Sequence, residues 1–599
     1  MSERKGVIAV SILAAAIYLG AAKHPPSLLD DADTVHAEAA REMAESGDWI
    51  TLHANGIRYL EKAPLMYWLV ALSYKVAGVN EFATRLPMAL ASVALALVAV
   101  AIGRYLFGPR AGIYAGLIIS SCVGIFLFTR VLWPDILLTL FESIAFYCFL
   151  RSLDESGKSR WALGIYIAGA LGVLTKGLVG AAFPAIIIFA YLLLTGDLRR
   201  LARLRLVSGT ALFLIIAAPW HIAAGLANPG SMMMGTPAPG QGKGFFWFYF
   251  MNEHVLRYLG KRYPQDYDTV PLLLFLGLHM AWLFPWSFFL PLAIRDFPRR
   301  LRGLDRENRS VLFLWVWAGV VILFFCFSTT QEYYTMPAYP AFALLLGEAL
   351  SREEEDRSLR TRKLLMLSQV AIAAAGVAVF VIGSSLYFKT RSIQVQGDIA
   401  STLTRNPDAY ALSLGHVLDL TPESLSMLEA PLLITAVAFL LGTTAALVFR
   451  LRGRAELAAI ALAVMMGGFF FCARASMSVL EPYLSSRPLA EVINGEYKNG
   501  DLIVINGEYE SGSSINFYTR RQVHILNGRR ANLEYGSYFK DAPDLFLDDS
   551  DITRLWEQSE RIFLVTDAEQ AGRLKQLLRG KVFTVAASGG KLIFSNQES

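Results

Sequence analysis

Cysteine, histidine and charged residues are scarce in this chain of 599 residues. The four cysteines, Cys122, Cys148, Cys326 and Cys472, all lie inside or at the ends of apolar segments, so we expect them to be packing residues. Their positions exclude a disulfide framework and a thiolate metal site. Only 18% of the residues are charged, and the chain shows neither an internal repeat nor a low-complexity tract. This composition excludes an ordinary soluble domain and a repeat protein.

Hydrophobic residues make up 54% of the chain, and they are gathered in long runs. Thirteen stretches have the length and apolarity of a membrane span, near residues 7–22, 86–107, 110–128, 135–151, 161–176, 178–195, 206–227, 270–294, 310–328, 336–350, 364–388, 430–449 and 456–475. The first stretch lacks the small-residue cleavage site of a signal peptide, so we expect a retained helix. The sequence therefore predicts a polytopic α-helical membrane protein.

Clusters of arginine and lysine predict the orientation, because short cytoplasmic loops collect positive charge. They fall on alternate loops only if a further apolar stretch, 63–78, does not cross the membrane. That stretch is short and contains Lys75, which favours an interfacial helix in contact with lipid at the outer surface. The prediction is about 13 spans, with the N-terminus inside, the C-terminus outside, and the loops 23–85 and 228–269 on the outer face. Since orientation already explains the basic clusters, no nucleic-acid partner is expected.

The last part of the chain, residues 476–599, has a different character. Charged residues and Gly/Asn/Asp turns separate short β-rich runs, "DLIVI", "SINFY", "VHIL", "RIFLVT", "VFTVAA" and "KLIFS". Residues 568–579 have the pattern of an amphipathic helix. The sequence thus predicts a membrane part over 1–475 and a small external α/β domain over 476–599.

Ionisable and aromatic residues recur on the loops predicted to lie outside. They are Asp30, Asp31 and Asp33, then Arg58, Glu61 and Lys62, then Asp135, Lys176, Glu253, His254 and Arg257, and finally Gln331, Glu332, Tyr333 and Tyr334. Simpler explanations exist for some of them: Lys62 as a lipid anchor, Asp135 as a helix-start residue, and Glu253 with Arg257 as a surface salt bridge. Charges so close to hydrocarbon nevertheless tend to mark functional sites. Acids, cations and tyrosine hydroxyls on one membrane face suit a lipid phosphate.

Several motifs in the first 350 residues carry a family resemblance. They occur in the order "HAEAAREMAESGDWI" (36–50), "NGIRYLEKAPLMYW" (55–68), "EFATRLP" (81–87), "WPDILL" (133–138), "LTKG" (174–177), "NEHVLRYL" (252–259) and "YTMPAYPAFALLLG" (334–347). Any one of them is weak, but the ordered set resembles the integral-membrane glycosyltransferases of the C-type (GT-C) fold. The resemblance is to the bacterial branch of the protein O-mannosyltransferase family, which includes lipid A aminoarabinose transferases.

The resemblance implies a function and a set of site residues. Such enzymes pass a sugar from a polyprenyl-phosphate carrier to a lipid, glycan or protein acceptor, at the external face of the bacterial cytoplasmic (inner) membrane. It places Lys62, Arg257 and Tyr334 near the donor phosphate, with Arg58 beside them. The essential acid is Asp33, with Asp31 as the alternative, and the second acid is Asp135. The remaining candidates, Glu61, Lys176, Glu253, His254, Gln331 and Glu332, are expected to support the catalytic residues or face the acceptor.

Two departures from the family pattern qualify this expectation. Ala32-Asp33 stands where the family usually has an Asp-Glu pair, which leaves the choice between Asp31 and Asp33 open. The loop 329–335, "TTQEYYT", has no lysine where relatives often do, so an uncharged acceptor is expected rather than an anionic one. The sequence identifies no cofactor with certainty: the carboxylates could recruit a divalent cation, but no ligand spacing demands one. The alternative function is a transporter or flippase of a lipid-linked substrate, which would predict inverted repeats that the sequence does not show.

Overall fold

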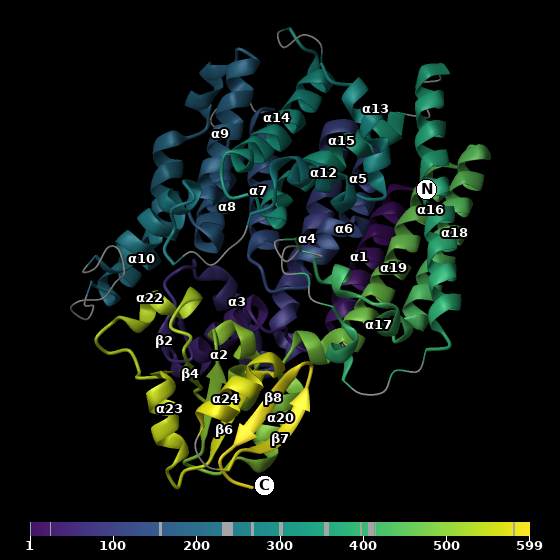
Figure 1. Ribbon diagram of the computed structural model, residues 1–599. Coiled ribbons are helices and arrows are strands. Elements are labelled where there is room, and N and C mark those ends of the chain that lie inside the picture. The colour runs from purple at the N-terminus through teal and green to yellow at the C-terminus, as the bar shows by residue number, and fades with distance from the viewer. Residues whose placement is uncertain are drawn as a thin grey trace.

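The computed structural model consists of a helical part and a smaller domain with a β-sheet (Figure 1). It describes residues 2–23, 26–154, 159–230, 243–264, 269–298, 303–352, 359–393, 395, 398–404, 406, 412–413, 415–578 and 581–598. Residues 231–242 and 265–268 of the predicted outer-face loop 228–269 lie outside the described residues. So do several basic residues that support the predicted orientation, among them Lys158, Arg299 and Arg300.

Helices occupy the apolar stretches of the sequence. They are α1 (Glu3–Lys23), α4 (Glu81–Phe107), α5 (Pro109–Ser121), α6 (Val123–Phe128), α7 (Asp135–Ser152), α8 (Trp161–Lys176), α9 (Val179–Leu194), α10 (Leu206–Ala227), α12 (Leu272–Trp282), α13 (Leu290–Arg295), α14 (Arg306–Cys326), α15 (Tyr339–Ser351), α16 (Leu359–Thr390), α18 (Glu429–Leu451) and α19 (Ala455–Leu484). Within the described ranges, six of them are long and apolar enough to cross a membrane, or seven if one bent pair counts as a span. The chain is a multi-pass membrane protein, while the count of 13 crossings remains a prediction.

Three predicted spans are not single straight helices. The stretch 110–128 is divided into α5 and α6 at Cys122, whose backbone is extended. The stretch 270–294 consists of α12 and a second segment that begins at Trp286, and the two are bent by 98°. Pro285 precedes this second segment, and a proline cannot supply the N–H that would continue α12. In the stretch 336–350 the chain first forms a 3₁₀-helix, η4 (Glu332–Ala338), and only then α15.

Two shorter helices lie between α1 and α4 in the chain. Helix α2 (Ala32–Ser46) is rich in Ala and Glu, which are strong helix formers, and it ends at Gly47 with φ 77°. Helix α3 (Leu65–Ala77) has 13 residues. At 1.5 Å per residue it is about 20 Å long, shorter than the roughly 30 Å of bilayer hydrocarbon. This length agrees with the interfacial position predicted for 63–78.

The C-terminal domain contains a six-stranded sheet in the order β5-β4-β3-β6-β8-β7. The strands are β3 (Leu502–Asn506), β4 (His524–Leu526), β5 (Phe546–Leu547), β6 (Ile562–Asp567), β7 (Phe583–Ser588) and β8 (Lys591–Ser595). The first four are parallel, and β8 and β7 run antiparallel at the other edge. A short amphipathic helix, α24 (Ala571–Leu577), lies within the stretch where the sequence predicts one.

One predicted strand in this domain is wrong. The run "SINFY" forms helix α21 (Ser513–Thr519) instead, with Ile515 and Phe517 buried. The reason is topological: β3 and β4 are parallel neighbours, so the chain between them must cross over, and a helix does so. The strand β5, with only two residues, has no sequence signal of its own.

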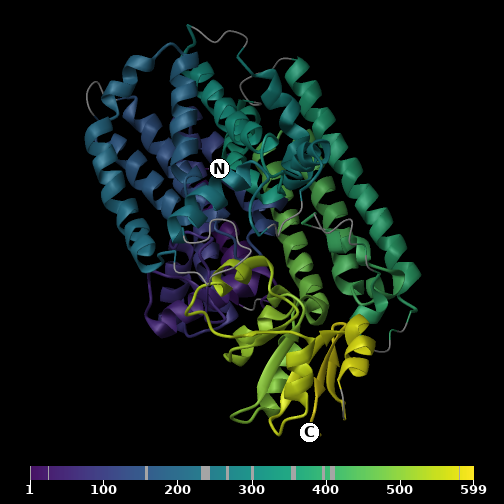
Figure 2. The same cartoon turned by 60° about the vertical axis from the view of Figure 1, so that its left-hand side comes forward.

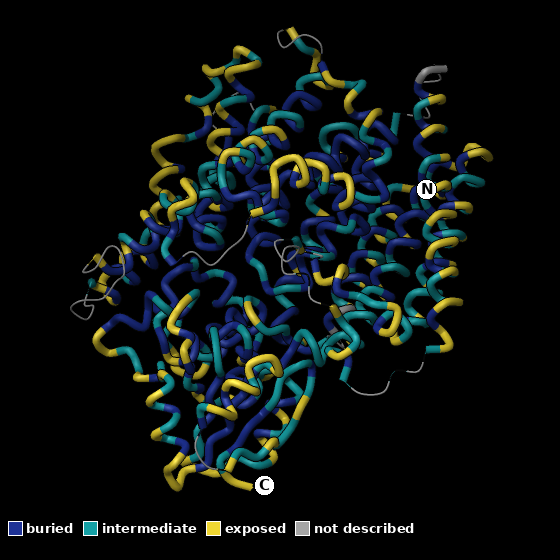
Figure 3. Tube along the Cα trace, viewed as in Figure 1, coloured by how far each residue is buried: buried dark blue, intermediate teal, exposed yellow. Residues whose placement is uncertain are grey.

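The sheet domain lies directly against α2 and the short strand β2 (Ile57–Arg58), at one end of the helical part (Figures 1 and 2). Helix α19 ends at Leu484, beyond residue 475, and α20 (Arg487–Glu496) then leads into the sheet. Asn55 forms two hydrogen bonds with the backbone of Val523, of 2.8 and 2.9 Å. The chain is buried where the two parts meet and along the central strands (Figure 3). The sheet domain is therefore packed onto the loops that carry the candidate residues.

The predicted orientation can be tested by cysteine labelling of the full-length chain. Ser550 in the sheet domain and Arg203 in a predicted internal loop are both exposed, whereas none of the four native cysteines is. A membrane-impermeant maleimide should label Ser550→Cys in intact spheroplasts and Arg203→Cys only after permeabilisation, because basic loops stay inside. The opposite pattern would reverse the orientation of every loop.

Candidate active site

Two cavities meet beneath the sheet domain. The first, called here the apolar cavity, has a volume of about 450 Å³ and is lined largely by side chains of α8, α9, α14 and the segment 249–259, including Leu178, Val179, Leu259 and Phe324. The second, the polar cavity, has a volume of about 490 Å³ and is lined by Asp31, His36, Tyr59, Gln331, Glu332, Ser413 and Asn532 among others. Both cavities are lined by Lys62, Trp133, Arg257 and Tyr333. Two cations and two aromatic rings thus form the junction.

The two junction cations belong to an alternating chain of charges. Lys62 pairs with Glu61 at 3.3 Å, and Glu61 pairs with Arg262 at 2.7 Å. Arg262 also pairs with Glu253 at 2.6 Å, and the other oxygen of Glu253 lies 2.9 Å from Arg257. Arg262 and both glutamates are buried, so this network holds the side chains of Lys62 and Arg257 in place. The cations Arg262, Lys62 and Arg257 keep the pKa of Glu61 below its usual value against the effect of burial, so this carboxylate stays charged.

Arg257 is placed by an unusual helical turn. It follows a ten-residue π-helix, Trp247–Leu256, a conformation that is common at functional sites. Its guanidinium donates a hydrogen bond of 2.8 Å to the Tyr334 hydroxyl, while the same guanidinium lines both cavities. The predicted partners Arg257 and Tyr334 are therefore brought together, and Glu253 is part of an interior network rather than a surface salt bridge.

Asp135 and Lys176 form an ion pair beside the apolar cavity. Asp135 begins α7 after Pro134, and Lys176 ends α8, so each charge is favoured by the dipole of its own helix. The ammonium of Lys176 lies 4.3 Å from the centre of the Tyr334 ring. Gly177 has φ 80°, and a Cβ there would lie 2.1 Å from the imidazole of His254, so the turn requires glycine.

His254 lines the apolar cavity as a neutral side chain. Its Nδ1 donates to the Tyr249 carbonyl at 2.7 Å, and its Nε2 accepts from the Leu178 N–H at 3.0 Å. Burial lowers its pKa. Both nitrogens are occupied, so His254 holds the α8–α9 turn in place rather than offering a free base.

Asp33 and Asp31 have different environments. Asp33 is fully buried: one oxygen accepts from the Leu132 N–H at 3.0 Å, and the other accepts from the Leu29 N–H at 3.1 Å and from Arg85 at 2.8 Å. It lines neither cavity. Asp31 is exposed and lines the polar cavity. The choice between the two acids stays a prediction, and of the two only Asp31 faces the polar cavity.

Asp31 also lies next to the sheet domain. It lines a third cavity of about 600 Å³, together with Glu508, Glu510 and Glu534. Burial raises the pKa of Glu510 to about 8, and the nearby charge of Asp31 adds to the rise. The raised pKa of Glu510 thus reflects its burial and its closeness to a second acid.

Glu332 is buried, and it lines the polar cavity with Gln331. One of its oxygens accepts from the Ser413 N–H at 3.3 Å, and among the described residues the other has no hydrogen-bond partner. Burial raises its pKa. The loop 329–335 therefore contributes acidic and amide groups to this cavity.

Arg58 does not reach the junction. Its guanidinium pairs with Asp541 of the sheet domain and donates to the Asn228 side chain at 3.0 Å. Hydrogen bonding by Arg58 lowers the pKa of Asp541. It lines neither cavity, so its predicted place beside the donor phosphate is not supported by the geometry.

Sequence reasoning missed several lining residues. Trp133 is one of them: its ring stacks on that of the candidate Tyr333 with ring centres 4.7 Å apart at the junction, and its position two residues before Asp135 could have suggested it. His36 accepts or donates a 2.8 Å hydrogen bond with Tyr67, and burial lowers its pKa to about 3. Asn532 comes from the sheet domain, and no local signal points to it. Over the described ranges, no group of three His, Cys, Asp or Glu side chains is arranged to hold a metal ion.

Known proteins resemble this chain in sequence and in structure. Residues 61–222 match the family model described as dolichyl-phosphate-mannose-protein mannosyltransferase. The structure of ArnT from Cupriavidus metallidurans bound to undecaprenyl phosphate superposes with a TM-score of 0.81 at 22% identity, over 100% of this chain and 99% of that one. The chain has the GT-C fold. The resemblance to the integral-membrane glycosyltransferases is confirmed.

Relatives are also found by sequence. An undecaprenyl phosphate-alpha-4-amino-4-deoxy-L-arabinose arabinosyl transferase 2 from Pseudomonas fluorescens is 27% identical over 364 residues, which is 59% of this chain and 62% of the relative. An uncharacterized protein from Aquifex aeolicus is 27% identical over 360 residues, 60% of this chain and 65% of the relative. The match thus spans less than two thirds of the length of these relatives.

Proposed function

We propose that the protein transfers a sugar from a polyprenyl-phosphate carrier to an acceptor at the external face of the bacterial cytoplasmic membrane. The observation that supports this most is the meeting of an apolar and a polar cavity at Lys62 and Arg257. A lipid phosphate needs this combination: an apolar space for its chain, cations for its charge, and a polar space for the group that it carries. The names of the P. fluorescens and C. metallidurans relatives point to the same class of carrier.

In the proposed reaction, the polyprenyl chain occupies the apolar cavity and the phosphate lies against Lys62 and Arg257. Asp31 accepts the proton of the acceptor hydroxyl in the polar cavity. The hydroxyl oxygen bonds to the anomeric carbon as the bond from that carbon to the phosphate oxygen breaks. Lys62, Arg257 and the Tyr334 hydroxyl stabilise the charge that develops on the departing polyprenyl phosphate. If the acceptor is itself a phosphate, no base is required, and Asp31 orients it.

Asp135 and Lys176 have a supporting role in this proposal. Their ion pair lies at the edge of the apolar cavity close to Tyr333 and Tyr334. Among the described residues, one Asp135 oxygen has no hydrogen-bond partner, and it could accept a hydrogen bond from a sugar hydroxyl of the donor.

The polar cavity favours an uncharged, hydroxyl-bearing acceptor. Its lining includes two acids, Asp31 and Glu332, together with the amides of Gln331 and Asn532. Carboxylates and amides bind hydroxyl groups well, and carboxylates repel anions. A glycan, a protein hydroxyl or an uncharged lipid head group fits this lining better than a phosphorylated one.

The function is tested by incubating the purified protein with a radiolabelled polyprenyl-phosphate sugar. We expect label to move to an added acceptor, or slowly to water, with release of polyprenyl phosphate. The alternative, a flippase, would move the intact lipid across a vesicle membrane without cleaving it. Intact donor after long incubation with glycan, peptide and lipid acceptors, together with transbilayer movement, would refute the proposed transfer.

Glu332→Lys should shift acceptor preference. The substitution replaces an acid by a cation in the polar cavity, and one unit charge at about 10 Å with an effective dielectric constant of 20 is worth ~1.7 kcal/mol. We expect the ratio of transfer to a phosphorylated acceptor over its dephosphorylated form to rise roughly tenfold, and the rise to shrink at high salt. Glu332→Gln is the control that removes the acid without adding a cation. An unchanged ratio in Glu332→Lys at low salt would remove Glu332 from the acceptor side.

A further inference from the structure

Asp31 has a backbone conformation that residues with a side chain rarely adopt. Its φ is 72° and its ψ −139°, a region populated almost only by glycine. Helix α2 begins immediately after it, at Ala32. A residue in this conformation keeps it only when the surrounding structure imposes it. Groups that surround Asp31 must therefore hold it in this conformation.

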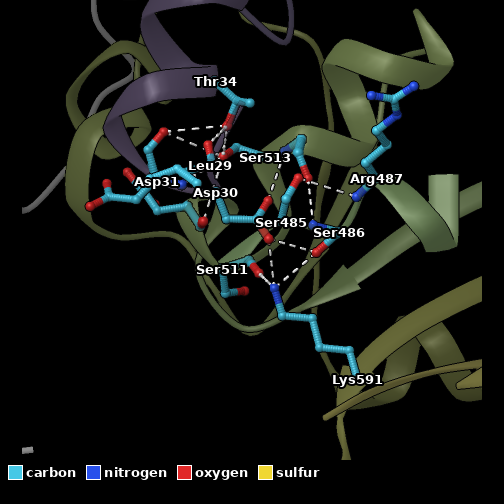
Figure 4. Close-up of polar contacts among 12 residues, drawn as sticks. Leu29, Asp30, Asp31, Thr34, Ser485, Ser486, Arg487, Ser511, Ser513 and Lys591 are labelled. Carbon is cyan, nitrogen blue, oxygen red and sulfur yellow. Dashed lines mark hydrogen bonds and ion pairs between the residues drawn. The ribbon is translucent and has the colours of Figure 1, made fainter. Parts of the chain in front are cut away.

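The groups that hold this turn come from the end of α19 and from the sheet domain (Figure 4). The Asp31 N–H donates to the Glu510 carbonyl at 2.9 Å and to the Ser513 hydroxyl at 3.0 Å. The Asp30 N–H donates to the Leu484 carbonyl at 3.0 Å. The backbone that leads into the strained residue is therefore tied to chain segments more than 450 residues away in the sequence.

The carboxylate of Asp30 is the centre of a second set of contacts. One oxygen accepts from the Ser514 N–H at 2.9 Å, and the other accepts from the Ser486 hydroxyl at 2.6 Å and from Lys591 at 2.7 Å. The Lys591 ammonium also donates to the Ser486 hydroxyl at 2.8 Å and to the Ser511 carbonyl. All three ammonium protons thus have acceptors.

This ion pair is shielded from water. The side chains of Lys591 and Asp30 are 15% and 11% exposed, in contrast to the 46% and 43% of the Arg573–Asp549 pair in the same domain. Removing one partner of a shielded, hydrogen-bonded pair is costly because it leaves an uncompensated charge, whereas an exposed pair contributes little. Lys591 opens β8, so the rigid sheet fixes where its side chain reaches Asp30.

From these contacts we infer that Lys591 and Asp30 are positioning residues for catalysis, which hold Asp31 in its strained conformation with its carboxylate in the polar cavity. This inference rests on the proposed function, in which Asp31 serves the acceptor. It gives the sheet domain a part in the transfer step, although Lys591 lines none of the three cavities described above. Without the ion pair, Asp30 and Asp31 are free to relax to a favourable φ, and the carboxylate leaves its position.

Kinetics of the full-length protein test the inference. Lys591→Met and Asp30→Asn should each lower kcat by roughly ten- to a hundredfold while leaving the KM for the polyprenyl-phosphate donor within about twofold, because only the acceptor side is disturbed. Lys591→Arg, which keeps the charge, should recover part of the loss. Arg573→Met, which breaks the exposed pair of the same domain, should have the kcat of the wild type. Ser486→Ala serves as the milder variant if Lys591→Met does not fold.

A double substitution separates positioning from general stabilisation. In an Asp31→Asn background, Lys591→Met should cause no further loss of the residual rate, because its effect passes through the Asp31 carboxylate. A loss as large as in the wild type would overturn the inference, and so would a Lys591→Met protein with the kcat of the wild type.

Hydrogen exchange provides a readout that does not depend on activity. The Asp31 amide is hydrogen-bonded to Glu510 and Ser513, so we expect slow exchange in the wild type and at least tenfold faster exchange in Lys591→Met. The exchange rates of the amides in β3 and β6 should be the same in the wild type and in Lys591→Met. If the Asp31 amide exchanged equally slowly in both proteins, the inference would be refuted even if the wild type proved inactive. If the exchange rates differed as expected but the wild type were inactive, only the proposed function would be refuted.

Discussion

Asp31→Asn should remove most of the transfer activity while leaving the carrier lipid bound. Asp31 is exposed in the polar cavity, and the lipid phosphate is proposed to lie on the cations at the junction. Losing a general base or an orienting carboxylate typically lowers turnover by about 10²–10⁴-fold. Measurement of kcat, with binding of polyprenyl phosphate followed separately, should show a large effect on the first and little on the second.

Asp33→Asn is the matched control, with a different expected defect. Asp33 neutralises the buried Arg85 at 2.8 Å, so its loss leaves a cation without its buried counter-charge. Breaking such a pair destabilises a protein by roughly 3–5 kcal/mol, and we expect a lower melting temperature with less effect on kcat per folded molecule. If Asp31→Asn proved fully active and Asp33→Asn folded but inactive, the catalytic assignment would return to Asp33.

The sequence predicts the local parts of this structure well. Apolar runs place the membrane helices, because this signal lies within the segment itself. The bends within 110–128 and 270–294 have weaker signals. A proline or an extended residue breaks the helix there without interrupting the apolar run, so hydropathy alone cannot separate one span from two segments.

Long-range pairing limits what sequence can predict about the site. Asp31 and Asp33 look alike in the sequence, and only the partners of each, Arg85 for Asp33 and the sheet domain for Asp31, distinguish them. Arg58 lies near Lys62 in the sequence, which suggests a shared site, but its guanidinium pairs with Asp541 instead. The run "SINFY" alternates like a strand, but the parallel order of β3 and β4 requires a helix there.

Alanine substitutions of Lys62 and Arg257 should impair both binding of the carrier and turnover. Both side chains line the two cavities, and the buried glutamates behind them keep them in place. A donor that stabilises charge in the transition state is worth about 10²–10³-fold in kcat. We expect each variant to lose activity on this scale and to bind polyprenyl phosphate more weakly, as measured by titration of the purified protein.

Arg58→Ala is the matched control for these two substitutions. Arg58 is also a cation of the segment 55–68, but it pairs with Asp541 and lines neither cavity, so its removal should leave carrier affinity unchanged. If Arg58→Ala weakened the carrier as much as Lys62→Ala does, the phosphate would not lie at the junction. Weaker carrier binding in Lys62→Ala and Arg257→Ala, but not in Arg58→Ala, would indicate a local phosphate site. A general attraction of anions to a basic surface would instead weaken binding equally on loss of any of the three cations.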